Sequence, residues 1–514
     1  MKKRSYMQGT KHLLIALLLC QGVGVEAVAH EGETHTDLSG TPIPNAPKCL
    51  ILSAARLFDG ISFPQENMAV LIEGNKVTKV DSPDKLSPLC SSRYDLGDAT
   101  ILPGLIESHA HITFQNVRKD KVLEHGITTV QDTGGPLQEV EGGQGSLRLL
   151  SVGPIIQAAG GYPLNVFGGG VGGYDKIGIP VSSVAEAEKV VDDLVKGGAT
   201  AIKIALEPGG EPGAPWMQPH GDQPVPATPW NLLPQEIVNA IAAKAHSLGK
   251  RVIAHVGENE GFKRALNGGI DEFAHMPCAA IDDSLLLQAV QQGVTFVTTI
   301  DTLGSCVNGS GMGIHSNTHK LTEIMAQNPG SKSQFIYGSE IGHDNVPWGV
   351  NGEELHMMLH LTSGASIDFN DVVNVIKSAT SKAGERLGIF GLGTLTQGAP
   401  ADIIAVRGNP FEKFKLLEYP DLVISGGRVV ANSFKNHSNT DCLFNWAEGK
   451  YPKDFASSGS FTKVGYGFTY RFYPAANTYL GVSMSDNHVY KMTSNGALVD
   501  QGYLSNWLSK SGCQ

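Results

Sequence analysis

The chain has 514 residues, of which 41% are hydrophobic and 17% charged, so it is long enough for two or three ordinary globular domains. A formal net charge of −11, with no basic stripe to offset it, argues against nucleic acid as a partner and gives no support for docking on an anionic membrane. These properties leave a small molecule as the expected partner. They are compatible with a homo-oligomer but do not require one.

The N-terminus has a basic start at residues 2–4, a short apolar run over 13–19 and a small-x-small motif at 27–29. This arrangement predicts a secretory signal peptide over residues 1–29, too short to span a membrane as a mature helix. A lipoprotein is the alternative, although the apolar residue before Cys20 disfavours it. No later run of about 18 apolar residues predicts a membrane span, so we expect a periplasmic or secreted protein.

Six of the seven cysteines remain once the predicted signal peptide is removed. An oxidising compartment favours disulfides, and we expect two of them, Cys49 with Cys90 and Cys442 with Cys513. The first pair flanks a β-rich segment near the N-terminus, and the second brackets the C-terminal tail. Cys278 and Cys306 can equally be free buried thiols, since sequence alone does not determine connectivity.

β-type runs separated by turn residues lie at both ends of a long middle segment. CLILSAARLFDG and MAVLIEGNKVTKV fall within residues 47–103, after a polar linker over 30–46. GTLTQGAPADIIAV and DLVISGGRVV fall within residues 396–432. We expect the two segments to form one small β-sandwich built from both chain ends.

Residues 104–395 alternate strand-like runs with helical patterns such as SSVAEAEKVVDDLVKGG and LPQEIVNAIAAKAHSLGK. The strand-like runs number eight in our interpretation: ATILPGLIESHAHI, GITTVQDTGG, GPIIQAAGG, ATAIKIAL, KRVIAHV, DEFAHMP, GVTFVTTI and SQFIYGSE. This alternation predicts an α/β fold with a parallel (β/α)₈ TIM barrel. A doubly wound open sheet would also alternate, but eight units fit closure better.

Aromatic residues crowd the tail over residues 441–514, where TYRFYPAANTYLGVS and HVYKMTS are typical of strands joined by turns. The final LSNWLSKSGC indicates a short helix. We expect a β-rich module whose aromatics fill its own core, because a small domain needs that buried area. A ligand platform is the alternative.

Residues able to bind a metal lie where the predicted barrel strands end, which is where barrel enzymes carry their chemistry. His109 and His111 are two apart on the first strand, so their side chains point the same way and converge on one spot. Of the other candidates, Lys203 lies in the fourth strand, whereas His255 closes the fifth, His275 the sixth and Glu340 the eighth. Together these residues predict a metal centre at one barrel mouth.

Lys203 stands in an apolar strand, where an unpaired ammonium is costly to bury. A lysine whose pKa is lowered by burial can react with carbon dioxide to form a carbamate. The carbamate is an anionic oxygen ligand able to bridge two metal ions, which gives this lysine a chemical reason for its position.

Five motifs together resemble the amidohydrolase superfamily, in its imidazolonepropionase-like and prolidase-like branch, over about residues 48–432. They are PGLIESHAHI, HGITTVQDTGG, IKI, AHVGENEGFKRALNGGIDEFAHMP and SATSKAGERLGIFGLGTLTQGAPADIIAV. The resemblance implies a barrel flanked by a β-sandwich made from both chain ends. It also implies two divalent metal ions, the first on His109 and His111, the second on His255 and His275, with a carboxylated Lys203 between them. Zinc suits such ligands.

One departure from the family concerns the end of strand eight, where Gly-Thr-Asp is usual and YGSEIGHDN stands here. Glu340 replaces the aspartate and has one more methylene, about 1.5 Å of extra reach. A carboxylate can still accept a proton, so we assign Glu340 both a metal-ligand and a proton-transfer role. His343 and Asp344, further along the loop, are candidates to share that role.

The resemblance implies hydrolysis of an amide or related C–N bond by a hydroxide shared between two metal ions, with a dipeptide, N-acyl amino acid or cyclic amide as substrate. The loop after Lys203 is rich in Gly and Pro, and its length predicts substrate contacts through His220 and Trp230, with His343 from the opposite loop. A hydrolase of esters, lactones or organophosphates is the alternative within catalysis. A non-catalytic secreted binding protein on a retired barrel is the alternative outside it.

Overall fold

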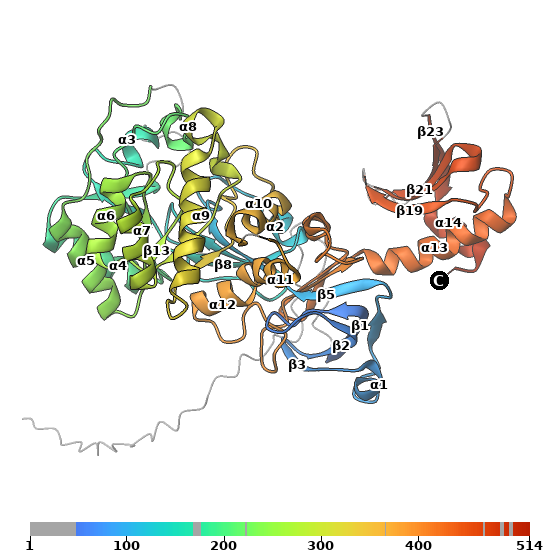
Figure 1. Ribbon diagram of the computed structural model, residues 1–514. Coiled ribbons are helices and arrows are strands. Elements are labelled where there is room, and N and C mark those ends of the chain that lie inside the picture. Colours follow the sequence, from blue (N-terminus) through green and yellow to red (C-terminus); the bar gives the residue numbers. More distant parts are fainter. Residues whose placement is uncertain are drawn as a thin grey trace, which may run out of the picture.

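The computed structural model describes residues 48–167, 176–220, 224–364, 366–465, 468–483, 488–492 and 497–513. The predicted signal peptide (1–29) and linker (30–46) lie outside the described residues. A helix-covered barrel, a β domain beside it and a C-terminal module reached through α13 (Ser433–Lys450) make up the described chain (Figure 1).

The barrel strands are parallel and form two sheets. β6 (Leu105–Ala110), β7 (Ile127–Asp132) and β8 (Arg148–Ser151) make the first sheet. The second follows the order β10 (Gly178–Val181), β9 (Ile155–Ala158), β11 (Ile202–Ala205), β12 (Val252–His255), β13 (Glu272–Phe273), β14 (Thr295–Val297) and β15 (Gln334–Ile336). β8 and β9 follow each other as two pieces of the third barrel strand, pairing with β7 and β11 respectively.

The barrel closes between its first and last strands at the mouth. The backbone N–H of Glu340 donates to the carbonyl of His109 at 3.0 Å, and the N–H of His111 donates to the carbonyl of Ile341 at 2.7 Å. The expected TIM barrel is therefore confirmed, and closure itself brings two of the candidate metal ligands to one place.

Helices cover the outside of the barrel because each has one apolar stripe. In α4 (Val184–Lys196), Ala187, Val191 and Leu194 are buried at helical spacing, and the Ser183 side chain accepts the N–H of Glu186 as an N-cap. The other principal helices of the described barrel are α2 (Lys119–Glu124), α5 (Gln235–Ser247), α6 (Asn259–Gly268), α7 (Asp283–Gln292), α9 (Met312–Gln327), α10 (Gly352–Thr362), α11 (Phe369–Ser378) and α12 (Ser381–Leu387).

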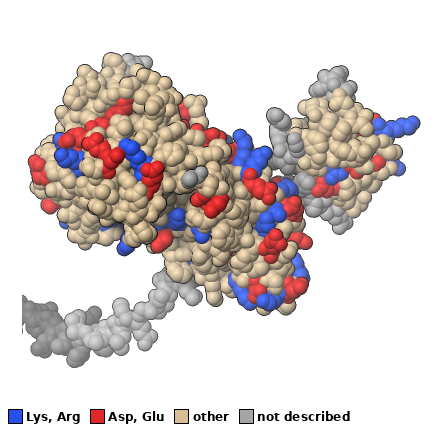
Figure 2. Space-filling model, in the orientation of Figure 1, with Lys and Arg blue, Asp and Glu red and all other residues tan. Residues whose placement is uncertain are grey.

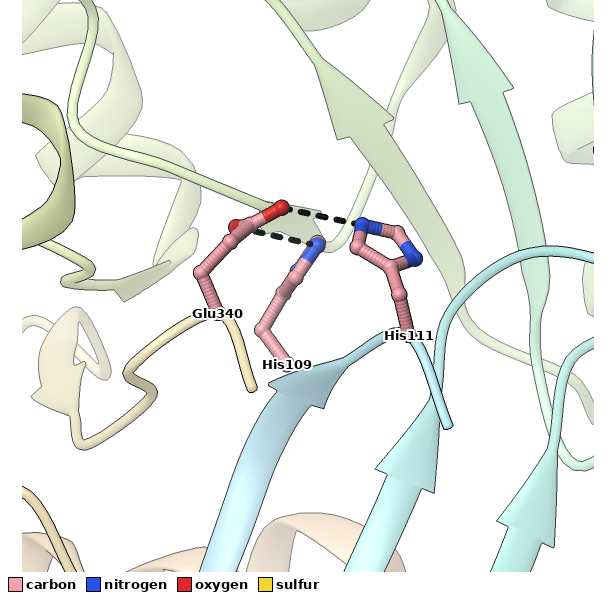
Figure 3. Close-up of side chains that lie close together, drawn as sticks. All are labelled: His109, His111 and Glu340. Atoms are coloured by element: carbon pink, nitrogen blue, oxygen red, sulfur yellow. Dashed lines mark hydrogen bonds and ion pairs between the residues drawn. The ribbon is translucent and has the colours of Figure 1, made fainter. Parts of the chain in front are cut away.

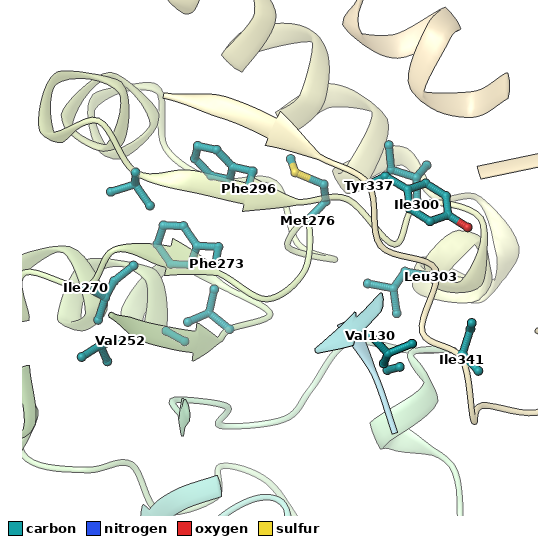
Figure 4. Close-up of a cluster of buried hydrophobic side chains, with 14 of the residues drawn as sticks. Val130, Val252, Ile270, Phe273, Met276, Phe296, Ile300, Leu303, Tyr337 and Ile341 are labelled. Carbon is teal, nitrogen blue, oxygen red and sulfur yellow. The ribbon is translucent and has the colours of Figure 1, made fainter. Parts of the chain in front are cut away.

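Buried aromatic rings fill the space between strands and helices. Phe273 stacks on Phe262 at a centroid distance of 4.1 Å and lies 5.5 Å from Phe296, in a cluster that also holds Val252 and Ile270 (Figure 4). This continuous core gives the strand ends at the mouth a rigid support.

Both chain ends contribute to one eight-stranded sheet beside the barrel. Its order is β18 (Arg428–Asn432), β17 (Leu422–Ser425), β16 (Ile403–Arg407), β5 (Ala99–Pro103), β1 (Cys49–Leu57), β2 (Gln65–Glu73) and β3 (Lys76–Asp81), with β4 (Arg93–Asp95) also beside β1. The junction is β5 with β16, antiparallel, where Ile101 pairs with Ala405. Leu52, Ile72 and Ile403 pack in its core.

The C-terminal module is an antiparallel sheet covered on one face by helices, and the expected β-rich region is present. The strands run in order as β19 (Phe461–Gly465), β20 (Phe468–Tyr473), β21 (Thr478–Ser483), β22 (His488–Met492) and β23 (Leu498–Tyr503), followed by α14 (Leu504–Ser511). Phe444, Phe455 and Tyr473 lie in its core, as expected. Tyr470, Tyr479 and other aromatics alternate onto the opposite face instead, where they line a hollow of about 240 Å³.

Three disulfides tie the described chain. Both expected pairs, Cys49–Cys90 and Cys442–Cys513, are present, and Cys278 pairs with Cys306. Within the described ranges, we find no helix of the length and apolarity needed to cross a bilayer. Lys and Arg intermix with Asp and Glu on the face shown in Figure 2.

Candidate metal centre

His109, His111 and Glu340 converge at the barrel mouth, with one ligand atom of each within 4.8 Å of the others (Figure 3). The ring Nε2 of His111 lies 2.9 Å from Glu340 Oε1, and Nε2 of His109 lies 3.6 Å from Glu340 Oε2. His109 belongs to β6 and His111 follows it directly, so the two side chains share a face as their spacing predicts.

Glu340 lies four residues beyond the end of β15, in a backbone conformation with φ of +68°. A non-glycine residue in this region is strained and persists only where its surroundings hold it. Glu107, buried on β6, provides such a hold because its carboxylate accepts the N–H of His109 at 2.8 Å and both the N–H and the hydroxyl of Ser339. One carboxylate thus ties the first strand to the residue before Glu340.

Lys203 points from β11 into the same space. Its Nζ lies 3.1 Å from Nε2 of His109, and the residue is only 1% exposed. Burial lowers the pKa of Lys203 to about 8, against the opposing effect of the Glu340 charge.

His255 and His275 complete the group. Their ring centroids are 5.0 Å apart, and His275 lies 4.4 Å from the ring of His109. Nδ1 of His275 is 2.9 Å from the Thr299 hydroxyl and 3.3 Å from Glu340 Oε2. All six predicted ligands therefore gather at one mouth.

Burial and mutual charge set the protonation of these groups. Burial lowers the pKa of His255 to about 3 and holds the pKa values of His109 and His275 well below their ordinary value. Burial alone would raise the pKa of Glu340, but the imidazoles of His275, His109 and His111 outweigh it, and the net pKa lies well below the ordinary value. Low pKa values favour the neutral imidazole at His109, His255 and His275, and the low pKa of Glu340 favours its ionised form; these are the forms that bind a cation.

The donor set fits a divalent cation. Oε2 of Glu340 and Nε2 of His255 are buried without a hydrogen-bond partner among the described residues, and so are the Nδ1 atoms of His109 and His111, whose Nε2 atoms face Glu340. Each such atom costs about 1–3 kcal/mol when it stays unpaired. Imidazole nitrogens with a carboxylate oxygen are the ligands that zinc prefers, and a cation held between the Nε2 atoms of His109 and His111 would also pair the unpaired Oε2 of Glu340.

Two buried glutamates lie behind His255. Oε2 of Glu207 is 3.5 Å from Nε2 of His255, and neither atom has another partner among the described residues. Oε1 of Glu207 accepts the N–H of Gly209 at 2.7 Å, and the Trp216 indole donates to Glu211 at 3.2 Å. Burial raises the pKa of both carboxyls to about 8.

A cavity of about 120 Å³ opens on these ligands. Of the substrate-contact residues expected from sequence, His220 and His343 line it, and so does Asp344. Trp230 lies one layer back among the described residues, where its ring stacks on Tyr162 at 6.1 Å and its indole donates to the Pro226 carbonyl. The substrate contact expected of Trp230 stays a prediction. The structure places the Trp230 side chain behind Tyr162.

Several residues of the site were not predicted from the sequence. Tyr162, Trp216 and Phe167 line the cavity from loops and from the short α3 (Leu164–Phe167), and only the loop path brings them there. Glu207 and Glu107 could have been predicted from the sequence, because each is a carboxylate that lies in an apolar segment within four residues of a predicted ligand.

Family comparison matches residues 100–430 of the chain to the amidohydrolase family. The chain belongs to the amidohydrolase family. This amidohydrolase is 23% identical to ochratoxinase of Aspergillus niger over 255 residues, which are 48% of this chain and 49% of that protein. It therefore spans about half the length of the curated relatives it matches.

Solved structures share its fold. A Xaa-Pro dipeptidase with bound methionine matches with a TM-score of 0.58 and 24% identity, covering 74% of this amidohydrolase and 99% of that chain. Phenylurea hydrolase B matches with a TM-score of 0.58 and 15% identity, covering 75% and 97%. The resemblance inferred from the sequence motifs is thus confirmed, and so is the fold that it implied.

Proposed function

We propose that the protein is a secreted, metal-dependent amidohydrolase that cleaves an amide or related C–N bond. The observation that carries this proposal is the convergence of four histidines, Lys203 and Glu340 beside one cavity. Family membership supports hydrolysis of a C–N bond. Three disulfides support an oxidising compartment.

His109, His111 and Glu340 would hold one divalent cation, and His255 and His275 a second, with carboxylated Lys203 between them. When bound, the two cations, which we propose to be zinc, would polarise the substrate carbonyl and lower the pKa of water near the site. The unpaired buried Oε2 of Glu340 supports the assignment.

Glu340 is the proton carrier in this proposal. Its carboxylate is ionised and lies within 3.6 Å of three imidazoles, so it can accept a proton from the attacking water and deliver it to the leaving nitrogen. The loop that carries Glu340 is tied to Glu107 through the N–H of Ser339, which holds the Glu340 carboxylate beside these imidazoles. Tyr162 and Trp216 wall the cavity and exclude bulk water from the reacting bond.

Names of the relatives suggest where to begin a substrate search. One relative is an ochratoxinase and one structural neighbour is a Xaa-Pro dipeptidase, so dipeptides, N-acyl amino acids and cyclic amides are the first compounds to test. Esters, lactones and organophosphates belong in the same screen, because the same chemistry could cleave them.

Metal analysis combined with this screen tests the proposal. About two metal ions per chain, together with hydrolysis of a C–N bond that a chelator abolishes, are the expected results. Preference for esters or lactones would favour the alternative hydrolase. A folded protein with no bound metal and no turnover would favour a binding protein on a retired barrel and would refute the proposal.

A further inference from the structure

The chain leaves the barrel wall directly before His111. β6 ends at Ala110, so His111 lies at the start of the turn that follows the strand, whereas His109 lies within the strand. The side chain of His111 is 12% exposed, and that of His109 is fully buried. The barrel itself therefore supports His111 less than it supports His109.

Only one nitrogen of the His111 ring has a partner among the described residues. Nε2 faces Glu340 Oε1 at 2.9 Å, and Nδ1 is buried without a hydrogen bond. A histidine that binds a metal ion usually donates its second ring N–H to a carboxylate or a carbonyl, and that bond fixes the direction of the ring. Because the His111 ring lacks such a bond, its direction depends on the backbone that carries it and on packing against Phe114, whose ring centroid is 4.9 Å away.

Asp132, at the end of β7, holds the turn that follows His111. The two strands are paired there, with Asp132 beside Ala110. Oδ1 of Asp132 accepts the N–H of Ile112 at 2.9 Å, and Oδ2 accepts the N–H of Thr113 at 3.2 Å together with the Thr113 hydroxyl. Three donors from two successive residues thus converge on one carboxylate, and they fix the backbone directly after the histidine.

The burial of Asp132 has no ion pair to explain it. The residue is fully buried, and among the described residues we find no lysine or arginine paired with its carboxylate. Asp402, which is also buried, pairs with Arg148 at 2.9 Å. Burying a carboxylate is costly unless hydrogen bonds compensate, and all the hydrogen bonds of the Asp132 carboxylate go to the turn beside His111.

We propose that Asp132 is a positioning residue of the metal centre, which holds the turn after His111 so that this ring can bind the first cation. Glu107 has the matching place on the other ligand of β6, since its carboxylate accepts the N–H of His109 at 2.8 Å. The inference rests on the proposed function, because it concerns the metal site of that activity.

The zinc affinity of Asp132→Asn tests the proposal. The amide keeps one acceptor oxygen and places N–H groups where the second oxygen accepted two donors. Loss of such an orienting contact typically costs 10- to 100-fold in metal affinity, so one of the two zinc ions should bind that much more weakly in a chelator competition. Asp402→Asn is the matched control, since Asp402 pairs with Arg148 at the start of β8, away from the mouth, and both zinc affinities should stay at the parental value.

A double-mutant cycle with His111→Ala shows whether Asp132 acts through that histidine. His111→Ala should leave about one zinc ion tightly bound per chain, and the further change Asp132→Asn should then alter the remaining affinity by less than about two-fold. A ten-fold loss of the remaining affinity in the double variant would show that Asp132 supports the whole site, as a merely structural residue would, and would overturn the proposal. Unchanged zinc affinities in Asp132→Asn alone would also overturn it.

Thr113→Val and Thr113→Ser separate hydrogen bonding from charge. Both variants leave the charge of Asp132 in place, but only serine keeps the hydroxyl that donates to it. We expect the affinity for one zinc ion to fall at least about three-fold in Thr113→Val and to match the parent in Thr113→Ser. Equal affinities in the two variants, beside a loss in Asp132→Asn, would assign that loss to charge and overturn the positioning role.

Hydrogen exchange of the metal-free chain keeps this inference separate from the proposed function. The N–H groups of Ile112 and Thr113 donate to Asp132, so they should exchange at least about ten-fold faster in Asp132→Asn, whereas amides in β12 should keep the parental rate. Unchanged exchange at these two residues would overturn the inference whether or not the protein hydrolyses an amide. The expected exchange and zinc results without any hydrolysis would support the inference and refute the proposed function alone.

Discussion

Replacing Glu340 by glutamine tests the assignment of the proton carrier. The amide has nearly the same shape and can still accept a hydrogen bond from His111, whose Nε2 is 2.9 Å from Oε1. It cannot accept the proton that hydrolysis releases. Loss of general acid–base catalysis typically costs 10² to 10⁴ in rate, about 3–5 kcal/mol, so kcat should fall by that factor.

Metal content separates a chemical effect from loss of the site. His109, His111, Lys203, His255 and His275 remain in Glu340→Gln, so the variant should retain most of its metal when measured by plasma emission after dialysis. Glu340→Asp is the matched variant, because it keeps the charge but shortens the side chain by about 1.5 Å. A displacement of about 1 Å can cost 10² in rate, so we expect a kcat 10- to 100-fold below that of the parent.

More than a tenth of the parental kcat in Glu340→Gln would refute the proton-carrier role. A variant that lost both metal and activity would instead make Glu340 chiefly a ligand. An aspartate variant as active as the parent would show that the longer glutamate is not required by the loop geometry.

Three further variants address the surroundings of the site. Arg386→Leu removes a buried guanidinium that donates to Glu272, with Nη2 2.6 Å from Oε1, and should cost about 3–5 kcal/mol in urea unfolding followed by tryptophan fluorescence. Burial raises the pKa of Glu354 to about 7, so the folded state binds the proton more tightly and stability should fall as pH rises from about 4.5 to 7. Buried Glu207 and Glu211 give slopes of the same sign, so Glu354→Gln should reduce the total slope by its own share, roughly 3 kcal/mol, in unfolding measured across this pH range. Glu207→Gln should weaken zinc affinity about 10- to 100-fold in a chelator competition, because Oε2 of Glu207 faces Nε2 of His255 at 3.5 Å and we expect it to orient that ring in the metal-bound protein.

Each of these variants has a control. Lys189→Ala breaks an exposed pair with Asp193, and a loss of stability in Arg386→Leu no larger than in Lys189→Ala would contradict the buried-pair argument. An unchanged pH slope in Glu354→Gln would assign that slope to other groups. Exposed Glu260 lies on α6, and equal zinc affinities for Glu207→Gln, Glu260→Gln and the parent would exclude the orienting role.

Strand periodicity was sufficient to predict the barrel and to place most of the candidate metal ligands. His109 and His111 lie two apart at the end of β6, Lys203 lies within β11 and His255 ends the parallel strand β12, so their convergence follows from regular geometry. Glu340 was predicted at the end of strand eight, but it lies on a loop beyond β15 with a strained backbone. Hydrophobic periodicity indicates neither strain nor loop direction.

The cavity wall was harder to predict because loops build it. Trp216 and Trp230 belong to the same Pro-rich loop, yet one lines the cavity and the other packs behind Tyr162. No regular period distinguishes the two positions, since their directions depend on contacts with distant segments. The directions of the aromatic side chains in the tail were also not predictable from the sequence. Strand register decides which of them lie in the core and which line the outer hollow.

The junction of β5 with β16 has a consequence for biogenesis. Thr100 donates to the carbonyl of Gly408, 308 residues later, so one edge of β5 stays unpaired until the whole barrel has been synthesised and β16 follows it. Until then β5 presents an unpaired edge, which is a template for aggregation. A chain truncated before β16 would keep that edge open, so we expect full-length synthesis to precede productive folding and chaperones to shield the nascent N-terminal strands.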